Sequence, residues 1–315
     1  MIVRLAHVEL AVDDLAASRA FYVDLLGFDV ALETATSLYL RGVEEFDAWS
    51  LALSRGDRRG LLRLGFRVDS PEALQALAAQ HERLGIPVDH VPAGAEPHQG
   101  PSVRVASPDG HPLEFFHEFD EVDVYEADGG VRLPMRRVHE QHGIPPTRLD
   151  HVNLRSTSPD ASLAYWRDQL GFSVSERWEH QDGTTGIAWL RRRRISHEVA
   201  FGAYQHAALH HVAYSVGDSA NVARVADLAA DGGFRAAIEF GPGRHGVSNA
   251  MAIYLRDPSG HRLEFYSGDY ERDLDRPPIT WPLAAYEDHG LMWWGQQPPA
   301  SFRETSNIAE DEPSE

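Results

Sequence analysis

The chain has 315 residues, of which 43% are hydrophobic and 24% are charged, a composition typical of a soluble globular protein large enough for two domains. Its formal net charge of −19 would repel phosphate backbones, which argues against nucleic acid as a partner. It contains no cysteine, so disulfides, thiolate metal sites and cysteine nucleophiles are excluded, and any metal must be held by His, Asp or Glu.

The N-terminal segment, MIVRLAHVELAV, begins directly as an alternating strand. It lacks the basic region, long apolar region and cleavage site of a secretory signal. No run approaches the roughly 18 apolar residues of a membrane span. The sequence therefore predicts a cytoplasmic protein without a membrane partner.

The first half predicts a series of strands and helices. Residues 5–30 (LAHVELAVDDLAASRAFYVDLLGFDV) predict a strand, a helix opened by an acidic turn, and a second strand after LGF. Residues 60–88 predict another strand followed by a helix. Residues 107–116 (SPDGHPLEFF) predict two strands joined by a Pro-Asp-Gly turn.

The second half repeats this order. Residues 149–174 (LDHVNLRSTSPDASLAYWRDQLGFSV) again predict a strand, a helix, and a strand after LGF. Residues 208–234 match the second strand and helix, and residues 257–266 (DPSGHRLEFY) match the strand pair. An internal duplication of this kind predicts an α+β fold of four strand–helix–strand modules, two in each domain.

The predicted domain boundaries follow from the duplication. An N-terminal domain spans 1–135, with modules at 1–60 and 61–120, and a C-terminal domain spans 148–270. The link at about 118–147 is rich in charge, glycine and proline. A C-terminal extension at 271–315 contains Trp281, Trp293 and Trp294, is expected to pack over the second domain, and ends in an acidic tail, NIAEDEPSE, expected to be disordered.

One further charged segment, the arginine run at 191–194, predicts a solvated strand end or a subunit contact rather than a nucleic-acid patch.

Three potential metal ligands fall at equivalent module positions in the second half. His151 and His211 lie on the first strands of the two modules, and Glu264 lies on the last strand. Because strand side chains alternate, Glu264 points away from the core face formed by Leu263 and Phe265. Buried imidazoles and a carboxylate need a partner, and a divalent metal satisfies all three.

Each of these residues also has a simpler interpretation. A single strand histidine is more often structural than a ligand, and Glu264 could pair with Arg262 at the surface. His210 competes with its neighbour for the ligand role. The L-x-H-V pattern at 149–152 recurs at 209–212, which selects His211 and predicts that His210 faces away.

The first half lacks one of the three ligands. It keeps His7 and Glu114 but has Arg63 where the second histidine is expected. A guanidinium carries only donors and a positive charge, so it repels a cation. The first half is therefore predicted to be a metal-free scaffold, with one active site per chain in the second half.

These motifs resemble the vicinal oxygen chelate superfamily over nearly the whole chain. Within it, the sequence resembles the type I extradiol ring-cleavage dioxygenases, most closely the homoprotocatechuate (3,4-dihydroxyphenylacetate) 2,3-dioxygenase branch. The most specific stretch is GPGRHGVSNAMAIYLRDPSGHRLEFYSGDY at 241–270, supported by ITWP at 279–282 and WWG at 293–295. The resemblance implies four βαβββ modules and cleavage of a catechol ring by O₂ to a muconic semialdehyde.

The resemblance also implies roles for individual positions. His151, His211 and Glu264 match the ligands of one Fe(II) or Mn(II). Catalytic roles are implied for His197 as acid/base, Tyr254 as hydrogen-bond donor to the catecholate, and His245 near the substrate. Residues Asn153 and Trp189 match positions that line the substrate and O₂ pocket. A homotetramer is the oligomer that the resemblance implies.

The sequence departs from this branch at two places. Arginines that hold a substrate carboxylate are expected there, but this chain has Phe240 and Gly290–Met292. A less charged catechol is therefore an alternative to 3,4-dihydroxyphenylacetate. Two other functions share the fold: a glyoxalase-like metal-dependent isomerase or epimerase, and a non-enzymatic protein that binds small molecules.

Overall fold

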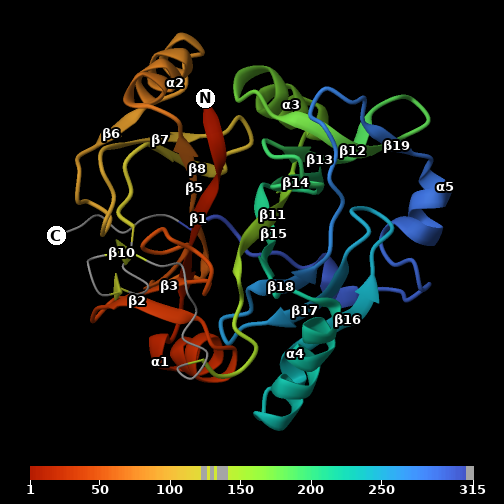
Figure 1. Cartoon of the computed structure of the whole chain (residues 1–315). Coiled ribbons are helices and arrows are strands. Elements are labelled where there is room, and N and C mark those ends of the chain that lie inside the picture. The colour runs from red at the N-terminus through yellow and green to blue at the C-terminus, as the bar shows by residue number, and fades with distance from the viewer. Residues whose placement is uncertain (122–125, 128–130, 133–140, 310–315) are drawn as a thin grey trace.

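The structure, a computed structural model, describes residues 1–121, 126–127, 131–132 and 141–309 (Figure 1). Part of the predicted link at 118–147 and the last residues of the acidic tail lie outside these ranges. A short ribbon, β9 (Glu126–Ala127) and β10 (Val131–Arg132), lies within the link.

The first half forms an eight-stranded mixed sheet. In hydrogen-bonded order its strands are β2 (Asp29–Glu33), β3 (Ser37–Arg41), β4 (Leu51–Arg55), β1 (Ile2–Val12), β5 (Gly60–Val68), β8 (Pro112–Phe116), β7 (Ser102–Ala106) and β6 (Asp89–Val91). The two central strands, β1 and β5, are antiparallel to each other, and each has a parallel neighbour on its other side.

The second half forms a nine-stranded sheet with the same plan. In hydrogen-bonded order its strands are β16 (Ile238–Arg244), β17 (Met251–Arg256), β18 (Arg262–Ser267), β15 (Ala208–Ser215), β11 (Arg148–Ser156), β14 (Val199–Ala203), β13 (Thr185–Arg191), β12 (Ser173–Glu179) and β19 (Ile279–Trp281). The last of these, β19, comes from the C-terminal extension and pairs in parallel with β12.

Five α-helices accompany the strands in the described part of the chain: α1 (Leu15–Arg19), α2 (Pro71–Arg83), α3 (Pro159–Ala164), α4 (Ser219–Asp231) and α5 (Leu283–Ala285). Turns of π-helix follow α1, α3 and α5, at Ala20–Leu25, Tyr165–Gln169 and Tyr286–Gly290, and single 3₁₀ turns lie at Arg235–Ala237 and Ala300–Arg303. Side-chain caps start three of the helices, because Asp14, Ser70 and Asp218 each accept a backbone N–H of the following turn.

The element order confirms the predicted fold class. Each module is a strand, a helix and three further strands, and four such βαβββ modules follow one another along the chain. Strand order in the first sheet, β2-β3-β4-β1-β5-β8-β7-β6, is repeated in the second as β12-β13-β14-β11-β15-β18-β17-β16. The sequence repeat thus corresponds to a structural repeat, in which every strand of the first sheet has a counterpart in the second.

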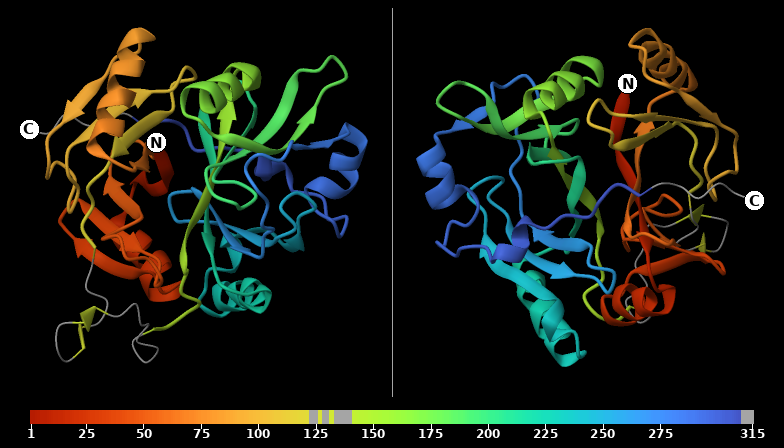
Figure 2. Two further views of the ribbon diagram at one scale, coloured as in Figure 1. Left: turned by 45° about the horizontal axis from the view of Figure 1, so that its top comes forward. Right: turned by 180° about the vertical axis from the view of Figure 1, so that it is seen from behind.

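The two halves lie side by side and share one apolar core (Figures 1 and 2). Phe28 packs against Tyr214 with ring centroids 4.8 Å apart, and Phe66 packs against Trp166 at 5.5 Å. The Tyr22 hydroxyl donates to Asp257 across the same boundary at 2.9 Å. These contacts hold the second sheet rigidly against the first.

The C-terminal segment also joins the halves. Ser306 exchanges backbone hydrogen bonds with Leu209 of β15, and residues 307–309 bond to Leu61 of β5. The predicted disorder of the tail is therefore wrong for Asn307, Ile308 and Ala309, which pair with the sheet because Gly60 leaves room for their backbone. Residues 310–315 lie outside the described part of the chain.

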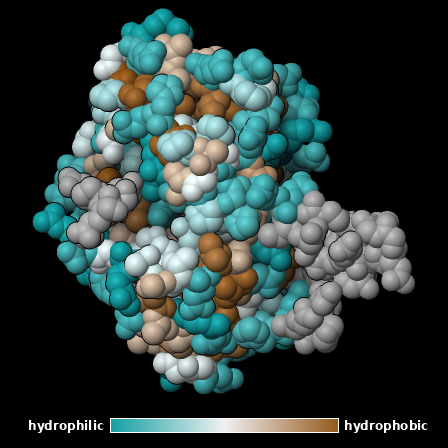
Figure 3. Space-filling model, turned by 90° about the vertical axis from the view of Figure 1, so that its left-hand side faces the viewer, coloured by the Kyte–Doolittle hydropathy of each residue, from teal (hydrophilic) through white to brown (hydrophobic). Residues whose placement is uncertain are grey.

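The surface over the first sheet is mostly hydrophilic, with separate apolar patches (Figure 3). None of the helices in the described part of the chain combines the length and apolar character that a membrane crossing requires.

Candidate active site

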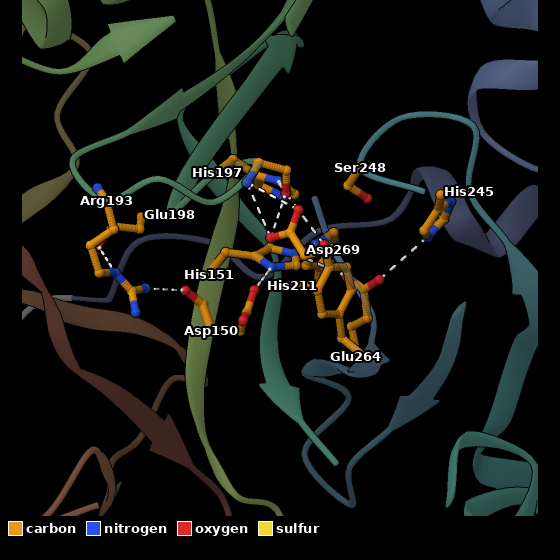
Figure 4. Close-up of polar contacts among 12 residues, drawn as sticks. Asp150, His151, Arg193, His197, Glu198, His211, His245, Ser248, Glu264 and Asp269 are labelled. Carbon is orange, nitrogen blue, oxygen red and sulfur yellow. Dashed lines mark hydrogen bonds and ion pairs between the residues drawn. The ribbon is translucent and has the colours of Figure 1, made fainter. Parts of the chain in front are cut away.

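The three predicted ligands converge at the centre of the second sheet, on the adjacent strands β11, β15 and β18 (Figure 4). Strand register brings them together. His211 is paired with Asn153, which lies two residues after His151, and Glu264 is paired with Ala213, which lies two residues after His211. The Nε2 atoms of His151 and His211 lie 3.1 and 3.0 Å from the same Glu264 carboxylate oxygen, Oε2. All three side chains are buried, and their donor atoms lie within 4.8 Å of one another.

This donor set fits a divalent cation. Burial alone would raise the pKa of Glu264, but the charge of His211 and hydrogen bonds from His151, His211 and His245 hold that pKa well below its usual range. The ionised carboxylate therefore needs positive charge in a site shielded from water. Two imidazoles and one carboxylate on one side of a cation leave other coordination positions open, which suits Fe(II) or Mn(II).

Polar neighbours orient both imidazoles. The Asp150 carboxylate lies 2.8 Å from Nδ1 of His151, so it can accept that proton and leave Nε2 toward the site. Nδ1 of His211 lies 2.8 Å from Nδ1 of His210, and Nε2 of His210 lies 2.8 Å from the Phe302 carbonyl. The prediction that His210 faces away is wrong, because it packs beside His211 as a hydrogen-bond partner. Sequence reasoning also missed Asp150, whose place directly before His151 was the available signal.

His197 lies next to the three ligands, in the loop that enters β14. Its ring centroid is 4.0 Å from that of His151, and its Nδ1 is 2.9 Å from the Ser196 hydroxyl. Burial lowers the pKa of His197 well below its ordinary value, and the positive charge of His151 acts in the same direction. The imidazole is therefore neutral in this site.

The arginine run holds this loop in place. Arg191 is buried and donates to the backbone carbonyls of Arg272 and Asp273, both at 2.7 Å. Arg193 pairs with the buried carboxylate of Glu198 at 2.8 Å. The prediction of a solvated strand end is therefore wrong for most of the run, because these guanidinium groups bind carbonyl oxygens and a carboxylate of the same chain.

His245 and Tyr254 form a second polar pair beside Glu264. Nε2 of His245 lies 2.9 Å from the Tyr254 hydroxyl and 3.3 Å from Oε1 of Glu264. The loop that carries His245 packs closely on the C-terminal extension, because a Cβ on Gly246 would lie 2.3 Å from the His289 carbonyl oxygen. The glycine thus permits the contact that fixes His245.

The predicted site residues open onto one cavity of about 430 Å³. His151, His197, His211, His245, Tyr254 and Glu264 all line it, as do the predicted pocket residues Asn153 and Trp189. Trp189 is also buried in an apolar cluster with Ala200 and Val247. The extension closes part of the cavity with Tyr286, Leu291, Phe302 and Arg303. Leu291 lies in the segment 290–292 that the resemblance placed near the substrate, whereas Tyr286, Phe302 and Arg303 were not predicted to line the site.

The position before GPGRHG, where the resemblance implied an arginine, is apolar in the structure. Phe240 packs with Tyr254, Met292 and Phe302. Met292, at the second such position, belongs to the same cluster. The two positions therefore carry apolar side chains where arginines were expected, and these pack against the cavity-lining residues Tyr254 and Phe302.

The first sheet shows what replaces the ligand set there. In the first sheet Arg63 is paired in register with Glu9, and Gly65 with Glu114. In the second sheet His211 is paired with Asn153 in the same way, and Ala213 with Glu264. The Arg63 guanidinium lies 2.8 Å from Glu9 and 3.8 Å from Glu114. A built-in cation thus lies among buried carboxylates, which supports the prediction of a metal-free first half.

Replacing Arg63 with methionine is expected to destabilise the fold by about 3–5 kcal/mol, because the buried carboxylates of Glu9 and Glu114 would lose a cation 2.8 and 3.8 Å away, while Glu114 keeps Arg104 at 2.9 Å. Equilibrium unfolding in urea measures this change. The matched control is Arg19→Met, which removes an exposed ion pair with Asp24 and should cost about 1 kcal/mol or less. Equal effects of the two substitutions would contradict the role of Arg63.

Comparisons with known proteins agree with the geometry. Residues 148–265 match the model of the glyoxalase/bleomycin resistance protein/dioxygenase superfamily, and residues 63–119 match a catechol 2,3-dioxygenase-like N-terminal domain. The chain is 30% identical to a manganese-dependent 2,3-dihydroxybiphenyl 1,2-dioxygenase from Geobacillus genomosp. 3, over 94% of this chain and 95% of that one.

Solved structures extend the likeness. Homoprotocatechuate 2,3-dioxygenase from Brevibacterium fuscum, in an anaerobic complex with 3,4-dihydroxyphenylacetate, is 36% identical with a TM-score of 0.91, covering 98% of this chain and 94% of that one. The enzyme from Arthrobacter globiformis is 37% identical with a TM-score of 0.90, covering 98% and 93%. These matches favour the dioxygenase over the isomerase and the binding protein. The chain belongs to the extradiol ring-cleaving catechol dioxygenases of the glyoxalase/bleomycin resistance protein/dioxygenase superfamily.

Proposed function

We propose that this protein cleaves a substituted catechol next to its two hydroxyl groups and inserts both atoms of O₂, giving a muconic semialdehyde. The observation that carries the proposal is the group of His151, His211 and Glu264, which opens onto a cavity also lined by His197, His245 and Tyr254. Either 3,4-dihydroxyphenylacetate or a related substituted catechol is the proposed substrate.

One Fe(II) or Mn(II) per chain would be held by His151, His211 and Glu264. The ion would supply Lewis acidity that favours the catecholate, together with a position where O₂ reacts beside it. The hydrogen bonds of Asp150 and His210 to the ligand imidazoles keep the ligand nitrogens in place during turnover.

The remaining residues would handle protons and position the ring. Neutral His197 would accept a catechol proton and return it as the ring opens. The Tyr254 hydroxyl, held by His245, would donate to a catecholate oxygen. Asn153 and Trp189 would shape the space for the ring and for O₂, so that both reactants meet in a fixed geometry.

The direct test is a ring-cleavage assay. Protein loaded anaerobically with Fe(II) or Mn(II) and mixed with a panel of catechols should consume one O₂ per catechol and form a yellow product. Removal of the ion by a chelator should abolish the reaction, and readdition should restore it. Protein that carries one ion per chain but consumes no O₂ with any catechol would contradict the proposal.

We further propose a cytoplasmic homotetramer. Trp293 and Trp294 are each 56% exposed on the extension, and burial of such side chains between subunits would be favourable. Sedimentation of the metal-loaded protein tests the oligomeric state.

A further inference from the structure

A cationic side chain that the reaction scheme does not use lines the cavity. Arg155 lies on β11 and shares a face of this strand with His151 and Asn153, because strand side chains alternate. Its Cα lies roughly 13 Å along the strand from that of His151. The guanidinium turns back toward the ligand group, because its Nη1 donates to the side-chain amide oxygen of Asn153, Oδ1, at 3.1 Å.

Arg155, which is half-buried, differs in its partners from the buried arginines Arg191 and Arg262. Arg262 pairs with Glu239 at 2.6 Å, and Arg191 donates to carbonyl oxygens of the extension. In the described part of the chain, Arg155 has no carboxylate within ion-pair distance, and its guanidinium has the single Asn153 hydrogen bond. Burial lowers the pKa of Arg155 to about 10, so the group still carries its charge at neutral pH.

The cavity offers no other anion to compensate this charge. Among its described lining residues, Glu264 is the only acidic one, and its carboxylate is already used by His151 and His211. Close packing fixes the guanidinium over β14, since a Cβ on Gly202 would come within 3.2 Å of its Nη1. Among the residues that the structure describes, none accepts a hydrogen bond from Nε or Nη2 of Arg155, and two parallel N–H groups suit a carboxylate.

Another part of the cavity is lined by Tyr254, Leu291 and Phe302, and Tyr254 and Phe302 pack in an apolar cluster with Phe240 and Met292. The two positions where the resemblance implied arginines therefore supply no positive charge to the cavity. Among the described lining residues, the arginines are Arg155 on β11 and Arg303 on the extension. An anionic substituent on a ring whose hydroxyls lie at the ligand group is therefore stabilised where it reaches one of these two side chains.

We propose that Arg155 binds the carboxylate of the catechol substrate, which makes this enzyme selective for catechols with an anionic substituent directed toward β11 and β14. This assignment rests on the proposed ring cleavage. It names an arginine in place of the two that the resemblance implied and that this chain lacks.

The test compares carboxylates with their neutral methyl esters. Dissociation constants for 3,4-dihydroxyphenylacetate, 2,3-dihydroxyphenylacetate and both esters are measured anaerobically by titration calorimetry on metal-loaded protein, and KM and kcat are measured in air. Wild-type protein should bind one of the acids at least about 10-fold more tightly than its ester, and Arg155→Met should reduce that preference by about 10- to 100-fold. Arg155→Lys should keep part of it, while Arg83→Met, an exposed charge on α2, should leave it unchanged.

Three results would overturn the assignment: esters that bind wild type as well as the acids, an undiminished preference in Arg155→Met, or an equal loss of affinity for acid and ester. The last would show that Arg155 only positions Asn153. Loss of the preference in Arg303→Gln rather than in Arg155→Met would move the anchor to the cavity rim and also contradict it. If no catechol is cleaved but the Arg155-dependent binding preference persists, the proposed function fails while this assignment stands.

Discussion

Replacing Glu264 with alanine is expected to empty the metal site and to lower the ring-cleavage rate at least about 1,000-fold. The carboxylate is the only negative ligand, and its Oε2 lies 3.1 and 3.0 Å from the two imidazoles that share the site. Without it, two neutral histidines must hold a dication in a buried site, which costs several kcal/mol of metal affinity. Metal content per chain and O₂ uptake measure the two effects separately.

The internal duplication provides a matched control. Glu114 holds the equivalent position in the first sheet, in register with Gly65 as Glu264 is with Ala213. Glu264→Gln should lose metal and activity, whereas Glu114→Gln should keep one ion per chain. Metal loss in Glu114→Gln, or full occupancy and turnover in Glu264→Ala, would contradict the assignment of the site to the second half.

Replacing His197 with phenylalanine is expected to lower kcat by about 10²- to 10⁴-fold while the ion stays bound. The ring lies beside His151 but is absent from the ligand group, and burial keeps it neutral, so its position beside the substrate cavity is what suits it to exchange a proton with the catechol. Phenylalanine keeps the ring's bulk and removes its nitrogens. Steady-state kinetics and metal content together separate a proton-transfer defect from a loss of metal.

His90→Phe, an exposed position on β6, is the control for general effects of the substitution and should change neither quantity. Wild-type kcat in His197→Phe would remove His197 from the reaction scheme. A loss of the ion in this variant would instead place His197 among the groups that hold the metal.

The sequence was informative where local patterns determine structure. Alternation placed Glu264 opposite Leu263 and Phe265, and both of these side chains are buried in the core. The repeat aligned Arg63 with His211, and strand register independently gives the same equivalence. These features depend on pairing within one sheet, which alternation and turns encode locally.

The sequence was uninformative about contacts between residues that lie far apart along the chain. Arg155 was overlooked because nothing in its neighbourhood shows that the extension closes a cavity over it with Tyr286 and Phe302. Arg191 looked solvated because its acceptors, at 272 and 273, lie far along the chain. Such partners are set by tertiary packing, on which short-range patterns carry no information.

One divalent cation is expected to lie between two imidazoles and a carboxylate of the second sheet. Anomalous scattering from a crystal of the Fe(II)- or Mn(II)-loaded protein would locate this ion. We expect a single strong peak per chain, bonded to Nε2 of His151, Nε2 of His211 and a carboxylate oxygen of Glu264. A peak beside His7 and Glu114, or a fully loaded protein with no peak among these three side chains, would contradict it.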